Sequence, residues 1–381
     1  MSDGSPGGGP RIVRVELQRV EDVPLTRPLA LAWDPGAVRT VDSFTIARVH
    51  TDDGRVGVGT VGRAKPARAA AAALIGAPLL ATDANAAALH DAGGAYGLDI
   101  ALWDLIGQGR GEPLWRVWGG YGDRVRAYAS TVEVGSDARR AEDAVGFADE
   151  GYRGLKLRLH HDTLAADVAL ATAVRAAVGD RLTLMADANQ ARAAAAGTGV
   201  RWSYERARDT ARALAELGYA WLEEPLADDD LDGLARLRDE GGLPIAGGER
   251  DQGPERLGAL ADGDAYDIVQ PDGVTGGAIG GFVALAARAH RRGARLVPHH
   301  GGGGVGAWAH LHLAAAVPNA GWFEVIRDRP GETPWPAQLV PVPRIAIDGN
   351  GDVVAPPGPG LGITLDDERL AAHTVGVTVI V

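Results

Sequence analysis

Ionisable side chains recur between residues 158 and 324 at intervals of 23 to 36 residues, about the length of one strand–helix unit. The series comprises Arg158, Asp187, Glu223, Glu249, Asp272, His299 and Glu324. The carboxyl ends of parallel strands meet at one edge of a sheet, so this spacing predicts one shared pocket. A single acid after a strand often only caps the next helix, but capping does not account for six successive positions.

Three carboxylates of the series, Asp187, Glu223 and Glu249, follow successive predicted strands. Packed together without a cation, they would repel one another and raise one another's pKa. A hard divalent ion removes that cost. Oxygen ligands with room for water suit Mg²⁺, or Mn²⁺, better than Zn²⁺. The sequence therefore predicts a magnesium site, with manganese as the alternative ion.

A histidine and two cations complete the set. His299 and Asp272 follow neighbouring strands, and a carboxylate behind an imidazole fixes its tautomer and raises its basicity. Lys156 and Arg158 share strand parity and therefore point the same way. Only two of the 38 basic residues are lysines, Lys65 and Lys156, so a lysine at this place carries more weight than usual. We expect His299 to act as a general base.

Regular strand–helix alternation from about residue 126 onward would position these groups. Short apolar runs alternate with amphipathic helical stretches, which is typical of β–α units around a parallel sheet. Eight such units in about 200 residues favour a barrel. The predicted strands are residues 126–132, 154–159, 182–186, 220–222, 244–248, 266–270, 295–298 and 321–323.

The first 120 residues show a different pattern. Residues 11–20 and 43–61 alternate as strands do, with a hairpin turn at Asp52-Asp53-Gly54. Residues 66–118 are rich in alanine and have helical spacing. Strands followed by helices indicate an α+β unit.

These patterns divide the chain into four parts. We expect the C-terminal segment, with its Pro/Gly punctuation and further strand-like runs, to return to the first domain. The predicted parts are a disordered tail over 1–10, a capping domain over 11–125, a barrel over 126–329 and the C-terminal return over 330–381.

Bulk composition excludes several classes of function. The 381 residues carry a net charge of −12, which disfavours nucleic acid and anionic membranes as partners. The chain has no cysteine, hence no disulfide or thiol chemistry, and no signal peptide is visible; both fit a cytoplasmic location. Residues 296–323 lack Asp, Glu, Lys and Arg, but they contain four histidines and a glycine run. They indicate a functional loop followed by a buried helix, not a membrane span.

The ordered motifs resemble the mandelate racemase subgroup of the enolase superfamily, and the resemblance covers nearly the whole chain. Residues 98–104 with Gly119-Gly120 resemble the end of its capping domain, and 357–362 resemble its C-terminal return. The most specific motifs are Lys156-x-Arg158, Asp187-x-Asn189, Glu223-Glu224-Pro225, Gly248-Glu249, Pro271-Asp272, His299 and Glu324.

The resemblance implies an α+β capping domain over a (β/α)7β barrel and a homo-oligomer. It implies Mg²⁺ held by Asp187, Glu223 and Glu249, and proton abstraction beside the carboxylate of a small-molecule acid. Removal of that proton places a second negative charge on the group, which the ion stabilises as an enediolate. Lys156 adds a cation there, and a protonated Glu324 would donate a hydrogen bond.

Position 158 departs from the subgroup's motif, in which a lysine often serves as the base opposite the histidine. Here it is Arg158, which stays protonated and suits a carboxylate clamp. Racemisation needs a base on each face, whereas elimination of water needs only one. We therefore expect a dehydratase that converts a sugar acid or related polyhydroxy acid to a 2-keto-3-deoxy acid. The alternatives are a racemase, epimerase or lactone cycloisomerase, and a non-catalytic acid-binding homologue.

Several further residues are candidates for substrate contact. Asn189 and Lys65 are assigned to substrate binding. His160 shares the parity of Arg158 and would offer a second base if that strand continued. His300 has the opposite parity to His299 and is expected to be structural. The glycine run 301–304 would bind an anion or let the backbone pass close to the substrate, and 191–202 would form a substrate-facing loop.

Overall fold

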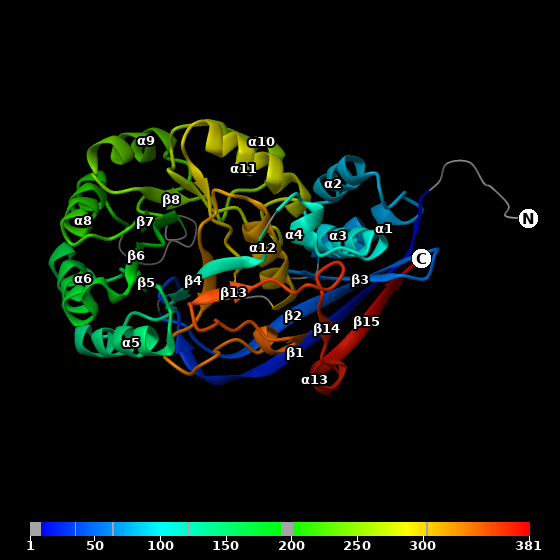
Figure 1. Cartoon of the computed structure of the whole chain (residues 1–381), viewed down its shortest axis with the longest axis horizontal. Helices are drawn as coiled ribbons and strands as arrows, with labels where there is room; N and C mark the ends of the chain where they lie inside the picture. The colour runs from blue at the N-terminus through cyan, green and yellow to red at the C-terminus, as the bar shows by residue number, and fades with distance from the viewer. Residues whose placement is uncertain (1–8, 35, 63–64, 121, 192–200, 302–303) are drawn as a thin grey trace, which may run out of the picture.

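The computed structural model describes residues 9–34, 36–62, 65–120, 122–191, 201–301 and 304–381. The predicted tail therefore lies almost wholly outside the described residues, as do most of the predicted loop 191–202 and two residues of the glycine run. Figure 1 shows a barrel beside a flat sheet, with the first and last strands of the chain lying together in that sheet.

The flat sheet has the strand order β15-β1-β2-β3. Its strands, all antiparallel, are β1 (Ile12–Ala30), β2 (Val38–Thr51), β3 (Val56–Val61) and β15 (Thr374–Ile380). The predicted hairpin turn joins β2 to β3. β1 is longer than predicted, because breaks in register between Val20 and Val23 and between Pro24 and Leu29 let the strand continue past two prolines.

Helices cover one face of this sheet (Figure 1). They are α1 (Lys65–Leu74), α2 (Thr82–Asp91), α3 (Gly97–Arg110) and the short α4 (Leu114–Val117). α3 packs closely on β3: a Cβ atom at Gly97 would lie 1.5 Å from the carbonyl oxygen of Thr60. This contact requires glycine and fixes the helix against the strand.

Eight parallel strands form the barrel, in the order β10-β9-β8-β7-β6-β5-β4-β11. They are β4 (Arg124–Ser130), β5 (Gly154–Arg158), β6 (Thr183–Asp187), β7 (Leu222–Glu223), β8 (Ile245–Gly247), β9 (Ile268–Val269), β10 (Arg295–Leu296) and β11 (Phe323–Ile326). All eight correspond to predicted runs. The last begins at Phe323 instead of 321, because Gly321 has a φ of +72° and lies outside the extended region.

Helices follow the barrel strands and surround them (Figure 1). They are α5 (Asp137–Glu150), α6 (Leu164–Val178), α8 (Tyr204–Glu216), α9 (Leu231–Glu240), α10 (Pro254–Asp262), α11 (Phe282–Arg291) and α12 (Gly304–Ala316). Among the described residues, short 3-10 helices occur at Gly179–Arg181, Ile279–Gly281 and Pro336–Leu339. α12 is the expected buried helix, with twelve of its thirteen residues buried.

The C-terminal part connects the barrel to the flat sheet. Its elements are β12 (Pro341–Val342), β13 (Asp352–Val354), β14 (Thr364–Leu365), α13 (Asp367–His373) and β15. β13 pairs antiparallel with the first barrel strand, β4, and β15 pairs antiparallel with β1. The chain therefore ends in the sheet in which it begins.

A layer of apolar side chains fills the barrel interior and supports the polar groups above it. This layer comprises Tyr128, Met185, Trp221, Ala246, Ile268, Val297 and Trp322. Two residues further along four of these strands, with the same parity, come Asp187, Glu223, His299 and Glu324. The polar residues thus project into the barrel at its carboxyl-terminal end.

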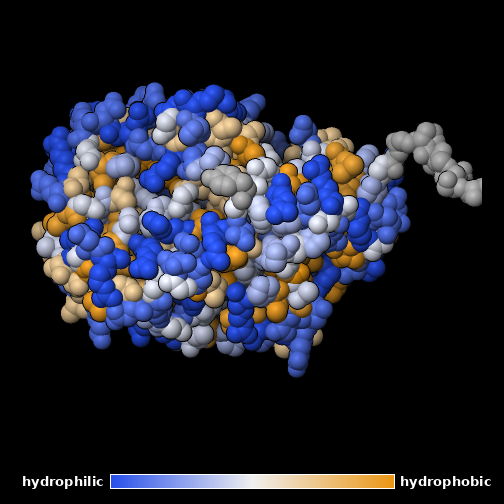
Figure 2. All heavy atoms as spheres, in the orientation of Figure 1, coloured by the Kyte–Doolittle hydropathy of each residue, from blue (hydrophilic) through white to orange (hydrophobic). Residues whose placement is uncertain are grey.

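The outer surface is mainly polar, with scattered apolar side chains on the face that Figure 2 shows. Over the described ranges, no helix has both the length and the apolar character needed to cross a membrane.

Candidate active site

Lys156 lies at the centre of a buried charge cluster at the carboxyl-terminal end of the barrel. Its Nζ is 2.7 Å from Glu223 Oε1, 3.0 Å from Glu324 Oε1 and 3.8 Å from Asp187 Oδ2. Burial alone would lower the pKa of Lys156, but Glu223 and Glu324 raise it well above its usual value. Lys156 therefore remains a cation.

Glu324 is ionised in this arrangement. Burial alone would raise its pKa, but the charge of Lys156, followed by that of His299, lowers it far below its usual value. The sequence suggested that a protonated Glu324 would donate a hydrogen bond. In the structure, the Glu324 carboxylate instead forms an ion pair with the ammonium group of Lys156, at 3.0 Å.

Arg158 is fixed by four hydrogen bonds of its guanidinium group. Its Nε donates to Thr131 O at 2.7 Å, and its terminal nitrogens donate to Asp187, to Asn189 Oδ1 at 3.2 Å and to Ser130 Oγ at 3.3 Å. Its Cζ lies 4.9 Å from the ring centroid of Trp33. The predicted clamp is thus directed mainly at a carboxylate of the protein itself.

The electrostatics exclude Arg158 as a base. Burial alone would lower the pKa of Arg158, but Asp187 and then Glu324 raise it above its usual value. A guanidinium that already has a high pKa and gains these partners keeps its proton.

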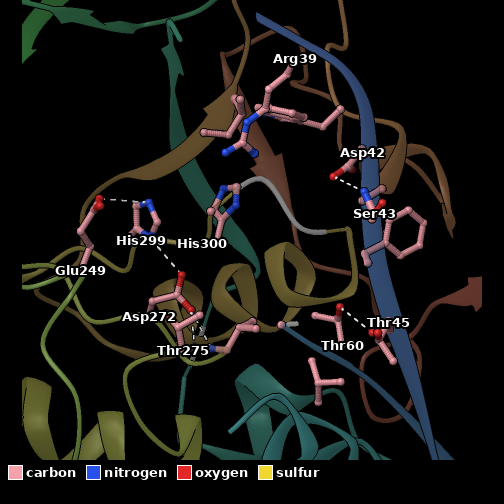
Figure 3. Close-up of a pocket in the computed structure, with 18 of the residues that line it drawn as sticks. Arg39, Asp42, Ser43, Thr45, Thr60, Glu249, Asp272, Thr275, His299 and His300 are labelled. Carbon is pink, nitrogen blue, oxygen red and sulfur yellow. Dashed lines mark hydrogen bonds and ion pairs between the residues drawn. The ribbon is translucent and has the colours of Figure 1, made fainter. Parts of the chain in front are cut away.

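His299 and Asp272 form the predicted pair on the opposite side of the barrel mouth (Figure 3). His299 Nδ1 is 2.9 Å from Asp272 Oδ2, and the two residues form an isolated parallel bridge beyond β9 and β10. The other ring nitrogen, Nε2, is 3.1 Å from Glu249 Oε2. The imidazole therefore lies between two carboxylates.

These carboxylates set the charge of the dyad. Burial alone would lower the pKa of His299, but Glu249 and then Asp272 raise it to about 10. Burial alone would raise the pKa of Asp272, but its hydrogen bond with His299 is one of several contacts that lower it to about 2. As a base, His299 would need its Nε2 to be free of both Glu249 and a proton.

The three expected metal ligands, Asp187, Glu223 and Glu249, are paired with Arg158, Lys156 and His299 respectively. Accordingly, within the described ranges, no three His, Cys, Asp or Glu side chains are arranged to hold a metal ion. The two carboxylates Asp187 and Glu223 nevertheless lie close enough to share Lys156.

The chemistry of this cluster fits a divalent cation. Burial, followed by the charge of Glu223, raises the pKa of Asp187 to about 7. Burial, followed by the charge of Glu249, raises the pKa of Glu224 well above its usual value. Its buried Oε2 has no hydrogen-bond partner among the residues that the structure describes. A hard divalent cation binds clustered carboxylate oxygens whose negative charge is not fully neutralised by the protein.

The remaining candidate residues have different outcomes. Asn189 lies in the site, where its Oδ1 contacts Arg158 and its backbone N–H donates to Asp187 at 2.8 Å. His160 contacts Asn189 Oδ1 at 3.3 Å, but β5 ends at Arg158, so the strand does not continue to His160. Burial lowers the pKa of His160 to about 4. Lys65 begins α1, and its side chain lies outside the described part of the chain.

His300 has a structural contact and also faces the site. Its Nε2 is 2.7 Å from the carbonyl oxygen of Glu324, and its ring stacks on Phe323 at 5.2 Å between centroids. It also lines the cavity above the dyad. His300 therefore has the expected structural contacts, with Glu324 and Phe323, and in addition lines the cavity.

A cavity of about 610 Å³ lies between the barrel mouth and the sheet β1–β2–β3. From the barrel it is lined by Arg158, Asn189, Glu249, Asp272, His299 and His300. From the sheet and the loops it is lined by Arg19, Trp33, Arg39, Asp42, Ser43, Thr45, Thr60 and Thr275, among others. Figure 3 shows Asp42, Ser43, Thr45 and Thr60 across the cavity from Glu249 and His299.

No sequence pattern indicated the cavity residues on the sheet side. They lie on strands that alternate regularly, and nothing in their spacing distinguishes them from other half-buried strand residues. Trp33 follows a part of β1 that was not predicted as strand. That part of β1 is tied to the barrel by Arg27, which pairs with Glu133 at 2.9 Å and with Asp328 at 2.5 Å, both remote in sequence.

The fold and this site define a barrel enzyme of the enolase type. Residues 138–369 match the family described as Enolase C-terminal domain-like, which is more than half of the chain. The chain therefore belongs to the enolase superfamily, and its relatives include mandelate racemase-type and muconate cycloisomerase members. The family and fold expected from the sequence are thereby confirmed.

Individual relatives differ in reaction. An arabinonate dehydratase of Saccharolobus solfataricus is 31% identical over 72% of this chain and 70% of its own length. A 3,6-anhydro-alpha-L-galactonate cycloisomerase of Streptomyces coelicolor is 31% identical over 96% of this chain and 99% of its own. The crystal structure of a racemase from Streptomyces coelicolor with bound magnesium has a TM-score of 0.82 at 28% identity, covering 96% and 100% of the two chains.

Proposed function

We propose that the chain is a Mg²⁺-dependent dehydratase of a sugar acid or related polyhydroxy carboxylate. One observation carries the proposal: His299 lines the cavity with Asp272 hydrogen-bonded to its Nδ1, the arrangement of a general base. Arg158 is a guanidinium, which keeps its proton with or without Asp187, and Lys156 is paired with Glu324 as well as with Glu223. One base suffices for elimination of water but not for racemisation through two opposed bases.

In the proposed reaction, His299 Nε2 takes the proton from the carbon beside the substrate carboxylate. The electron pair left on that carbon forms a double bond to the next carbon as the hydroxyl group there leaves. His299 returns its proton to the departing hydroxyl, so that water is released. The enol product then tautomerises to a 2-keto-3-deoxy acid.

The chain's own residues would orient the acid for this step. Asp272 holds the tautomer of His299, and Lys156 supplies positive charge on the other side of the barrel mouth. Asp187, Glu223 and Glu249 would hold Mg²⁺, or Mn²⁺, with Lys156, Arg158 and His299 released from them. The bound ion would supply the positive charge that stabilises the second negative charge on the carboxylate group.

The cavity wall supports a polyhydroxy substrate. Ser43, Thr45, Thr60 and Thr275, which carry hydroxyl groups, and Asp42, which carries a carboxylate, are among the residues that line it. Hydroxyl groups donate and accept hydrogen bonds, and carboxylates accept them, so a wall of this composition suits sugar hydroxyls.

A panel of sugar acids with MgCl2 tests the proposal directly. Semicarbazide detects the 2-keto acid that dehydration would form. We expect product from at least one polyhydroxy acid, and no product after removal of the metal with EDTA until Mg²⁺ is restored. Absence of keto acid across the panel would contradict dehydration.

A cycloisomerase is the second candidate. The cycloisomerase relative matches nearly the whole chain, whereas the dehydratase relative matches 72% of it. Epimerases are also found among the relatives at similar identity. Consumption of an acid or lactone with formation of an isomer, and without keto acid, would favour this alternative.

We also infer a homo-oligomer and a cytoplasmic location. The first rests on the resemblance to the family, and the second on the absence of cysteine from the 381 residues. Sedimentation of the purified protein and fractionation of cells would test them.

A further inference from the structure

The turn that carries Asp272 is held by a second, fully buried histidine. His310, on α12, is 0% exposed, and its Nε2 is 2.7 Å from the backbone nitrogen of Gly273. Its Nδ1 is 2.6 Å from the carbonyl oxygen of Gly306, one turn earlier in the helix. His310 therefore contacts the backbone directly after the carboxylate that orients His299.

These contacts fix the protonation state of His310. Because the Gly273 N–H donates, Nε2 must be the unprotonated acceptor. Nδ1 then carries the proton and donates it to Gly306 O. Burial lowers the pKa of His310 to about 4, which agrees with a neutral ring.

The peptide unit between Asp272 and Gly273 is held from both sides. Its N–H donates to His310, and its carbonyl oxygen accepts from Gly276 N at 2.8 Å and Gly277 N at 3.2 Å. The carboxylate is held by the same turn, because Asp272 Oδ1 accepts from Val274 N at 2.7 Å. Oδ2 is thereby left to face His299 Nδ1 (Figure 3).

Close packing of α12 on the turn makes this contact possible. A Cβ atom at Gly306 would lie 2.8 Å from Val274 Cγ2. The first turn of the helix can approach residues 272–276 only because position 306 has no side chain. The helix therefore presents His310 directly beneath the turn.

We propose that His310 is a positioning residue, which sets the direction of the Asp272 carboxylate and thereby the ring orientation of His299. The inference rests on the proposed role of His299 as the base. Loss of the His310 acceptor leaves the buried Gly273 N–H without its partner. An unpaired buried N–H costs free energy, so rotation of the Asp272–Gly273 peptide unit toward another acceptor becomes favourable. The Asp272 carboxylate would rotate with it.

The same helix provides a matched control. His312 is also 0% exposed, accepts from a backbone nitrogen (Trp115 N, 3.2 Å) and contacts a backbone oxygen (Leu361 O, 3.1 Å). Its partners lie at α4 and in the C-terminal segment, away from the dyad. His310 and His312 thus have similar burial and similar hydrogen bonds but different neighbours.

The experiment compares His310→Phe with His312→Phe, using the acid that the panel shows to be turned over fastest. We expect His310→Phe to lower kcat by roughly 10- to 100-fold with KM changed less than about 2-fold, because the dyad is misaligned while the cavity is kept. His312→Phe should change the melting temperature similarly but leave kcat within about 2-fold. His310→Gln, whose amide oxygen can replace Nε2 as acceptor, should restore most of kcat.

A spectroscopic readout does not depend on turnover. In protein labelled with ¹⁵N-histidine, the Nδ1–H proton of His299 is identified by its absence from His299→Asn. We expect this signal to shift or broaden in His310→Phe and to stay in place in His312→Phe and His310→Gln. Should His310→Phe not fold, His310→Asn replaces it, because the shorter amide cannot reach Gly273 N.

The outcomes separate the two proposals. Equal kcat and an unchanged dyad signal in His310→Phe and His312→Phe would overturn the role of His310 and leave His299 as the base. Failure of His310→Gln to restore kcat would also overturn it. Full turnover by His299→Asn would instead overturn the proposed function.

Discussion

The two sides of the barrel mouth differ in how their basic residues are held. On β5, Lys156 and Arg158 lie among buried carboxylates, and each keeps a raised pKa. Beyond β9 and β10, His299 has one carboxylate at Nδ1 and one at Nε2, and the second of these, Glu249, is an expected metal ligand. The guanidinium of Arg158 keeps its proton even without Asp187, whereas a metal ion on Glu249 would free His299 Nε2 to lose its proton. Proton transfer is therefore expected on one face only.

Removal of the imidazole should have the largest effect. His299→Asn keeps a polar side chain but cannot accept the proton, so kcat should fall by roughly 10²- to 10⁴-fold, the usual contribution of a general base. Steady-state kinetics on the best acid of the panel measures it. The exposed His290→Asn, on α11, serves as control. A loss smaller than 10-fold would assign the proton to another group.

Replacement of Lys156, the cation at the centre of the buried cluster, should have the next largest effect. This effect is on the stability of the fold. Lys156→Met leaves Glu223 and Glu324 buried without their shared partner, which typically costs about 3–5 kcal/mol. Denaturant unfolding in EDTA measures the free energy of unfolding.

The control for this prediction is Arg236→Met, which breaks the exposed pair with Glu240 and should have much less effect. Equal effects of the two variants would mean that Lys156 is not the partner on which the buried carboxylates depend.

Arg158→Lys changes the chemistry of the β5 side without removing its positive charge. A lysine can lose its proton, whereas a guanidinium does not. We expect hydrogen exchange to appear on the second face of the substrate, with elimination retained within about 10-fold. Intact elimination without exchange on the second face would mean that pairing with Asp187, and not the guanidinium group itself, prevents proton transfer at position 158.

Trp33→Leu should have the smallest effect. It removes the half-buried aromatic ring beside the buried Arg158. We place this contact at the weaker end of the cation–π range, roughly 0.5–1 kcal/mol, so kcat/KM should fall by about 2- to 5-fold. Trp202→Leu removes a similar contact with Arg206, where the ring centroid is 4.7 Å from Cζ. A similar loss of kcat/KM in both variants would exclude a specific role for Trp33 in the cavity.

The barrel and the composition of its polar ring were predictable from the sequence. Each β–α unit returns the chain to the same edge of the sheet, so residues such as Asp187, Glu223 and Glu324 fall together whenever their spacing matches one unit. Parity also predicted correctly that Lys156 and Arg158 point the same way, since both approach Asp187. Sequence periodicity was sufficient to predict the barrel and its polar ring, because the barrel repeats one β–α unit.

Pairing within the ring was not predictable. Spacing does not show that Arg158 binds Asp187 or that Glu249 contacts His299, because these contacts depend on side-chain reach in three dimensions. Trp33 follows the end of β1 that Arg27 ties to Asp328, about 300 residues away in sequence. His310 lies in an uncharged helix whose pattern indicates burial only.

The fate of deuterium from the solvent tests the central claim of one-sided proton transfer. The wild-type protein with Mg²⁺ and its best acid is incubated in D2O, and both the product and the recovered acid are analysed by NMR and mass spectrometry. We predict one deuterium at C3 of the 2-keto-3-deoxy acid and no recovered acid with inverted configuration at C2. Deuterated acid with inverted C2, formed without keto acid, would contradict the account.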